Sequence, residues 1–186
     1  MSETKAIGAV ELSSIGKGFE VLDAMLKAAA VEVILSRTIC SGKFLIVIGG
    51  PVSDVTSALA VASPAAGEAM IDEHLIADVH DSVFPALGQS VELDTDDVDA
   101  MGVIETFGAV STIAAADAAA KAAGVTLFKI HLAMALGGKG FCQMTGPLSD
   151  VQAAVKAGAD DARARGLLVS DIVIPRPEHE LFEEYL

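Results

Sequence analysis

The chain has 186 residues, of which 52% are hydrophobic and 4% aromatic, and its formal net charge is −14. This acidity, together with 12 basic residues that form no run, argues against nucleic acid as a partner. No stretch of about 18 uncharged apolar residues is present, so we expect no membrane span and expect the apolar surface to be buried between subunits.

The first half of the chain begins with strand-like and helix-like patterns. The apolar run Ala6 to Leu12 predicts a strand, and Gly16 to Ala29 carries apolar side chains at helical spacing. Two β-branched runs, Val31 to Ile39 and Lys43 to Ile48, are joined by Cys40-Ser41-Gly42. They predict a hairpin with Cys40 at its tip, in which Gly42 takes a positive φ.

A second helix and a closing strand are expected in the rest of this half. Ser53 and Asp54 offer an N-cap for a helix toward Gly67, which Pro64 should kink or end early. A short strand is expected over Leu75 to Val79.

The second half predicts the same order of elements. Strands are expected near Met101 to Thr106, Val125 to Leu132, Gly140 to Thr145 and Leu167 to Ile174, helices near Ala109 to Ala122 and Ser149 to Arg165, and a final helical turn within Pro177 to Leu186.

The order repeats because the sequence itself repeats. Gly8-Ala9-Val10-Glu11 recurs as Gly102-Val103-Ile104-Glu105, 94 residues later, and Gly42-Lys43 recurs as Gly138-Lys139, 96 residues later. Two residues are therefore inserted in the second copy between Val125 and Gly138. We predict a first domain over 5–88, an acidic linker over 89–99 and a second domain over 100–186. Each is expected to be a small α/β domain of the α+β, ferredoxin-like kind, a mostly antiparallel sheet with helices on one face.

The repeated motifs resemble the shell domains of bacterial microcompartments. The motifs are a first strand ending in Val-Glu-Leu, a helix with Asp-Ala-x-x-Lys-Ala-Ala, a short Gly-Lys hairpin and a helix start Gly-x-x-Ser-Asp-Val. Two copies in one chain resemble the tandem-domain trimeric shell proteins, most closely the propanediol-utilisation T type, whose loop Thr-Ile-Cys-x-Gly-Lys-Phe matches Thr38 to Phe44. The closing run Val173 to Pro177 also fits, and the resemblance covers Ala6 to about Phe182.

This resemblance implies a structural protein. Three subunits would form a tile that mimics a hexagon and packs beside other shell proteins, with Lys27 and Lys121 at the tile edges. An encapsulated redox enzyme is a further expected partner. The polar, acidic start, Met1 to Lys5, lacks a signal-peptide pattern and predicts a cytoplasmic location. The resemblance implies that this location is a microcompartment shell.

Cys40 is the candidate metal ligand. A thiol at a hairpin tip on a three-fold axis would meet two copies of itself, and thiolates hold iron–sulfur clusters. The resemblance implies one [4Fe-4S] cluster per trimer at Cys40, although Ser41 stands where proline is found in this type. A cluster-free metabolite pore and an inert thiol remain alternatives. The expected pore loops comprise Ile39, Cys40, Ser41, Gly42, Met134, Ala135, Leu136 and Gly137.

Other functions find less support. Cys142 lies mid-strand and is expected to be a core thiol rather than a ligand. The sequence shows no ligand-spaced histidine pair and no specific Ser/His/Asp grouping, so we do not predict an enzyme. Tandem ferredoxin-like domains also occur in ligand-sensing regulators, but these need a cleft or a long mobile loop, whereas both hairpins here are short.

Overall fold

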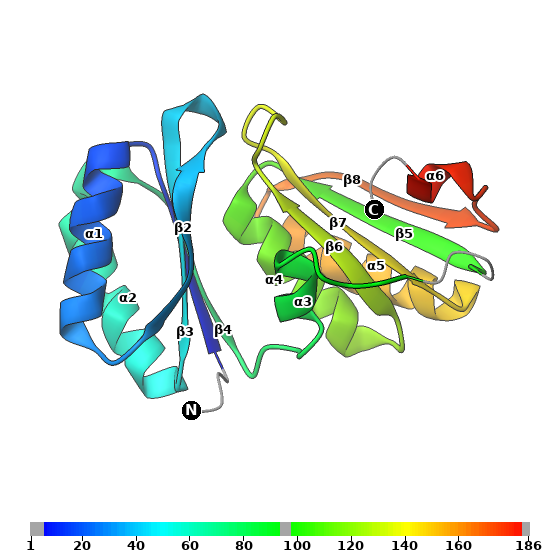
Figure 1. The fold of residues 1–186 in the computed structure, drawn as a ribbon, viewed down its shortest axis with the longest axis horizontal. Coiled ribbons are helices and arrows are strands. Elements are labelled where there is room, and N and C mark those ends of the chain that lie inside the picture. The colour runs from blue at the N-terminus through cyan, green and yellow to red at the C-terminus, as the bar shows by residue number, and fades with distance from the viewer. Residues whose placement is uncertain (1–5, 94–97, 184–186) are drawn as a thin grey trace. The chain divides into compact units, whose positions relative to one another are not determined.

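The computed structural model describes residues 6–93 and 98–183 (Figure 1). They divide into two compact units. The first unit holds the described residues up to Val79 together with Gly108–Val110 and Ala133–Gly138, and the second holds the others. Residues 80–88, which the sequence places with the first repeat, lie in the second unit, where the backbone N–H of His80 donates to Asp117 at 2.8 Å.

The first unit is a four-stranded antiparallel sheet with two helices on one face (Figure 1). Its strands stand in the order β2-β3-β1-β4. The elements are β1 (Ala6–Leu12), α1 (Ile15–Ala28), β2 (Glu32–Ile39), β3 (Lys43–Gly50), α2 (Val52–Ala66) and β4 (Met70–Ala77), with 3-10 turns over Cys40–Gly42 and Gly67–Ala69.

The helices pack closely on this sheet, which explains why strand β1 is buried and contains a glycine. Every residue of β1 is buried, and a Cβ at Gly8 would lie 2.8 Å from the Val55 side chain of α2. Glycine at this position therefore lets α2 approach the sheet closely. Val10, Met25, Phe44 and Val55 belong to the core formed between sheet and helices.

The second unit repeats the architecture. Its strand order is β6-β7-β5-β8, again antiparallel. The elements are α3 (Val83–Leu87), β5 (Ala100–Thr106), α4 (Ala109–Ala122), β6 (Thr126–Leu132), β7 (Gly140–Gly146), α5 (Leu148–Ala164), β8 (Leu168–Pro175) and α6 (Glu180–Glu183). The described part of the chain contains no helix long and apolar enough to cross a membrane.

The structure confirms the predicted fold class, the hairpin at Cys40 and the helix over Ala109–Ala122. Ser53 and Asp54 do not cap α2, because the helix already begins at Val52 and its N-cap, Pro51, makes no side-chain cap hydrogen bond. Asp54 instead places a negative charge in the first turn, where the helix dipole favours it.

Two further expectations about this half need correction. Pro64 does not end helix α2 at once, because the helix continues two residues past it; the proline is exposed in the last turn, where water can solvate the carbonyl group that it leaves without a donor. A kink at Pro64 stays a prediction. Strand β4 begins at Met70 rather than Leu75. The acidic residues Asp72 and Glu73 made the first part of this strand look like a loop in the sequence. They are tolerated because β4 is an edge strand.

The end of the predicted first domain contains a helix that the sequence did not predict. Helix α3 is only five residues long and contains Pro85, so its periodicity is too short to recognise. Of the predicted linker over 89–99, residues 94–97 lie outside the described residues.

Candidate functional site

The hairpin tip between β2 and β3 is the candidate site. Cys40 opens the turn and is partly exposed. Gly42 has φ +71°, as predicted, but Ser41 also lies in the left-handed region, with φ 64° and ψ 24°. Non-glycine residues rarely adopt this conformation, so the tip has a defined and unusual backbone.

A second loop lies against this tip within the first unit. It is Ala133–Gly138, and the backbone N–H of Cys40 donates a 2.8 Å hydrogen bond to the carbonyl oxygen of Ala133. Positive φ angles occur at Ala133, Ala135, Gly137 and Gly138. Left-handed residues that interrupt a loop in this way can turn neighbouring N–H groups toward one side, an arrangement that suits an anion.

The group of this kind that lies beside the second loop is the Cys40 thiol. The backbone N–H of Leu136 is the largest influence on the pKa of Cys40 and lowers it below that of an ordinary cysteine. Partial desolvation acts in the opposite direction, and the N–H groups of Ala135, Gly138 and Gly137 lower the pKa further. The thiolate is the form that binds metals, so the loop favours the form of Cys40 that can act as a ligand.

An ion pair fixes the base of the two loops. Lys43, directly after the Cys40 turn, contacts Glu11 with 2.8 Å between Nζ and Oε1. Glu11 is fully buried, and its other oxygen accepts from the backbone N–H of Ala109 at 2.9 Å. The ammonium group of Lys43 lies 3.5 Å from where a Cβ would stand on Gly138.

The second unit carries the same pair as Glu105 and Lys139. In the sequence, both glutamates and both lysines belong to the repeated motifs, but their pairing was not predicted. The repeat could have indicated it, because a Glu and a Lys that recur together on neighbouring strands are expected to contact each other in both copies.

The structure brings the predicted pore-loop residues together in these two loops. Ile39 is buried at the end of β2, while Ser41, Gly42, Met134, Ala135 and Gly137 are exposed and Leu136 is half-buried. That they line a pore stays a prediction. The backbone N–H groups around Cys40 are the part of the site that the sequence did not reveal.

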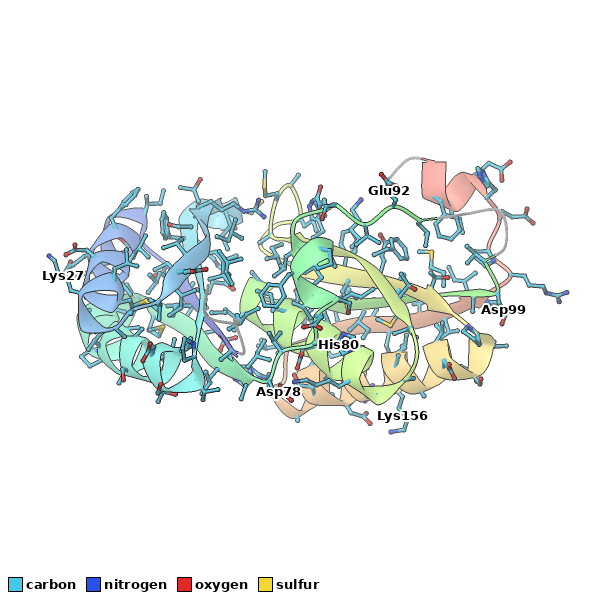
Figure 2. All side chains as sticks on the ribbon, turned by 60° about the horizontal axis from the view of Figure 1, so that its bottom comes forward. Lys27, Asp78, His80, Glu92, Asp99 and Lys156 are labelled. Carbon is cyan, nitrogen blue, oxygen red and sulfur yellow. The ribbon has the colours of Figure 1, made fainter. Side chains whose placement is uncertain are left out.

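The two predicted edge lysines occupy equivalent helix positions but differ in exposure. Lys27 extends from α1 (Figure 2), and its side chain is 74% exposed and pairs with Asp23 at 2.6 Å. Lys121 pairs with Asp117 at 2.6 Å and is 38% exposed. Both lysines can reach a partner while keeping a local counter-charge, and their role at a tile edge stays a prediction.

Cys142 is a core thiol, as predicted. It is fully buried in β7, and burial raises its pKa to about 12. Burial therefore favours its protonated form, which is not the form that binds metals.

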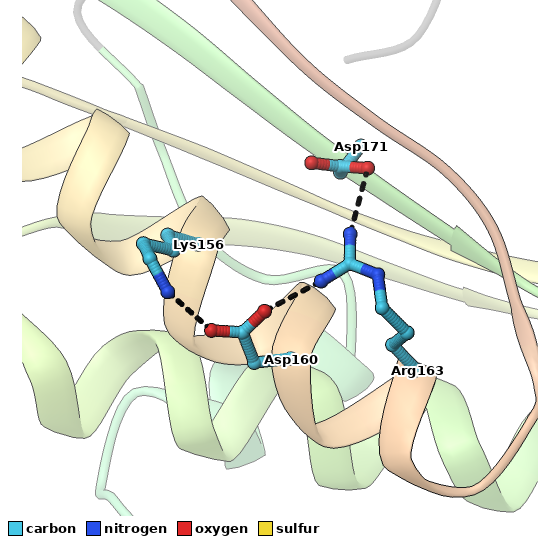
Figure 3. A network of polar contacts seen from close by, with 4 residues as sticks. All are labelled: Lys156, Asp160, Arg163 and Asp171. Atoms are coloured by element: carbon cyan, nitrogen blue, oxygen red, sulfur yellow. Dashed lines mark hydrogen bonds and ion pairs between the residues drawn. The ribbon is translucent and has the colours of Figure 1, made fainter.

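The remaining charged clusters do not form a second site. Figure 3 shows one network, in which Asp160 contacts Lys156 and Arg163, and Arg163 contacts Asp171 at 3.5 Å. Hydrogen bonding from Lys156 lowers the pKa of Asp160, but all four side chains are well exposed, which makes them a solvated surface network. Within 6–93 and 98–183, no group of three or more His, Cys, Asp or Glu residues could hold a metal ion.

The two similar units and the cysteine hairpin define a tandem-repeat protein of one α/β domain, and comparisons with known proteins identify that domain. The BMC domain model matches residues 6–79 and again 100–177. The chain therefore belongs to the BMC-domain family, the shell proteins of bacterial microcompartments, with the domain present twice.

Individual relatives agree with this assignment. The chain is 41% identical to the bacterial microcompartment shell protein PduT of Citrobacter freundii over 97% of both chains. It is 42% identical to the shell protein EutM of Salmonella typhimurium over 47% of this chain and 90% of that one. A crystal structure of a microcompartment protein from Desulfitobacterium hafniense superposes with a TM-score of 0.87 and 38% identity, covering 96% and 98% of the two chains.

These relatives are structural proteins and not enzymes. The chain is accordingly a structural shell protein with two BMC domains, similar to PduT, as the sequence predicted. The alternative of a ligand-sensing regulator is wrong, because the matched family and the curated relatives are shell proteins.

Proposed function

We propose that three copies of this chain form a ring of six BMC domains, a tile of a microcompartment shell, with the Cys40 loops at its centre. The repeat supports this arrangement, because two domains of one fold in each chain can occupy six equivalent positions in a trimer. The exposed residues of both loops, Ser41, Met134 and Ala135 among them, would then line the central opening.

We further propose that the three Cys40 thiolates of a trimer hold one [4Fe-4S] cluster. The residues fit this group, because Cys40 is partly exposed and the backbone N–H groups of 135–138 favour its thiolate. Amide donors to cysteine sulfur are also a known means of tuning such clusters. One chain supplies one such ligand at this site, so a cluster requires cysteines from several subunits.

A bound cluster would supply one-electron redox chemistry at the shell. The chain's own contribution is to hold the sulfur at the hairpin tip, to donate backbone N–H groups to it, and to fix the loops through Lys43 and Glu11. Electrons could then pass between the two sides of the shell, with an encapsulated redox enzyme as the partner. The observation that carries this proposal is the place of Cys40 at a partly exposed hairpin tip, held against the loop Ala133–Gly138, whose backbone N–H groups lower its pKa.

The test is iron analysis of anaerobically purified protein. Wild type should contain close to four iron and four sulfide per trimer and give an electron paramagnetic resonance signal after reduction. Cys40→Ser should abolish both, and the matched control Cys142→Ser should retain both because Cys142 is a buried core thiol. Iron that survives Cys40→Ser, or a trimer that stays colourless after reconstitution, would contradict the cluster and favour a metabolite pore.

A further inference from the structure

The two repeats carry the same ion pair in different surroundings. Glu11 pairs with Lys43, and at the equivalent positions Glu105 pairs with Lys139. The side chain of Glu11 is fully buried, whereas that of Glu105 is 28% exposed. Since the fold and the pair are the same, the difference arises from what covers each glutamate.

The start of helix α4 covers Glu11. The carboxylate oxygen of Glu11 that does not contact Lys43 accepts a hydrogen bond from the backbone N–H of Ala109, the first residue of α4. A carboxylate at this place satisfies an N–H that has no partner inside the helix and lies at the positive end of the helix dipole. The corresponding oxygen of Glu105 accepts from the hydroxyl of Ser170, at 3.1 Å, and from no helix N-terminus among the described residues.

Helix α1 is the repeat equivalent of α4 and lacks such a carboxylate. Ile15, its first residue, precedes Ala109 by the same 94 residues that separate Glu11 from Glu105. Ser14 caps the N–H of Lys17, and the first turn contains no acidic residue. Among the residues that the structure describes, the backbone N–H groups of Ile15 and Gly16 have no hydrogen-bond partner.

The two helices also differ in exposure. Helix α4 is buried along most of its length, with Ala109, Val110 and Ile113 at 0% exposure. Helix α1 exposes Ile15 at 39%, Phe19 at 62% and Leu26 at 43%. An exposed apolar helix face beside an N-terminus with two unbonded N–H groups is the complement of a surface that carries a carboxylate.

We propose that the contact of Glu11 with Ala109 inside one chain recurs between chains, with Glu105 of one subunit receiving the backbone N–H of Ile15 at the start of α1 of the next. The partner is a second copy of this chain, and the inference rests on the proposed trimer. Each subunit offers both halves of the contact on different surfaces, so the interface is heterologous and three copies close it into a ring.

The first test is the trimer's dissociation, measured by sedimentation over a range of protein concentrations. Glu105→Gln removes the charge but keeps the shape of the side chain, and should weaken each joint about tenfold to a hundredfold, the usual range for a hydrogen bond to a charged group. The circular dichroism spectrum should stay that of a folded chain. Asp160→Asn, which removes an exposed carboxylate that pairs within its own helix, should leave the dissociation unchanged.

The second test is cross-linking in a Cys40→Ser background. Ile15→Cys combined with Glu105→Cys should give covalent dimers and trimers with a short bifunctional thiol reagent, and either single variant should give none. A wild type that sediments as a monomer would overturn the proposed trimer together with this joint. A stable trimer that is indifferent to Glu105→Gln, and whose double-cysteine form cross-links only within a chain, would overturn the joint alone.

Discussion

Replacing Gly158 by alanine should destabilise the second unit, although alanine favours helices more than glycine does. Gly158 is buried in α5, and a Cβ there would lie 2.4 Å from the carbonyl oxygen of Ala115 in α4 and 2.5 Å from Cδ1 of Ile104. These distances are about 1 Å inside ordinary van der Waals contact. The carbonyl belongs to a helix backbone, so relief requires α5 to move away from α4.

The size of the effect follows from two opposing contributions. Overpacking against backbone should cost about 3 kcal/mol, the upper part of the usual range. The greater helix preference of alanine returns about 1 kcal/mol. The net loss in the free energy of unfolding is about 2 kcal/mol, or a fall in Tm of about 4–8 °C for a chain of this size.

Urea denaturation followed by circular dichroism, at one fixed protein concentration, measures this loss. Ala153→Gly, at an exposed position of the same helix, measures the helix preference alone and should cost about 1 kcal/mol. Adding Ile104→Val to Gly158→Ala should not restore stability, because the carbonyl contact remains. A Gly158→Ala variant that is as stable as wild type, or more stable, would refute the close approach of α4 and α5.

Three further predictions concern the loops and the edge. In cluster-free protein, Cys40 should alkylate at lower pH than a free cysteine derivative does, because its lowered pKa forms the thiolate at lower pH, while the buried Cys142, with a pKa of about 12, should stay unreactive near neutrality. Mass spectrometry at stepped pH measures both thiols, and a midpoint for Cys40 at or above that of the free cysteine derivative would show that the amides do not act on it. Ser41→Pro should lower the Tm and change the alkylation of Cys40, because proline cannot adopt the φ of +64° that Ser41 has. Ser41→Gly should be tolerated, because glycine adopts this conformation readily. Equal behaviour of the two variants would contradict the left-handed turn. Lys27→Ala should leave the trimer intact in sedimentation and reduce the extended sheets seen by electron microscopy. Lys156→Ala, at an exposed lysine that also pairs within its own helix, is the control and should change neither result. Dissociation of the Lys27→Ala trimer would argue against an edge role.

The order of elements could be predicted because both repeats carry clear periodicity. The apolar run of β1 and the helical spacing in α1 gave elements within about one residue of the observed bounds. The errors occurred where side-chain pattern and backbone geometry diverge. Strand β4 looks polar because it lies at a sheet edge, and the start of α2 follows Pro51 rather than the Ser and Asp that resemble a cap.

The site could be predicted only as far as side chains define it. Cys40 stood out as a thiol at a hairpin tip, and the turn itself was visible from Gly42. Its surroundings are backbone N–H groups of a loop whose residues, Ala135 and Leu136 among them, have no polar side chain. Left-handed φ at Ala133 and Ala135 is not indicated by alanine, so the shape of that loop could not be foreseen.

The two-residue insertion explains how the repeats divide their roles. Thr38 pairs with Phe44 across the first hairpin, and the equivalent pair in the second is Leu132 with Gly140, so the extra residues lie in the second loop. The longer loop supplies the amides and the shorter one supplies the thiol. A ring of six identical domains could not separate these roles, because each loop would carry the same residues. Duplication within one chain permits a donor loop beside every cysteine, and in the proposed trimer this limits the thiols at the centre to three.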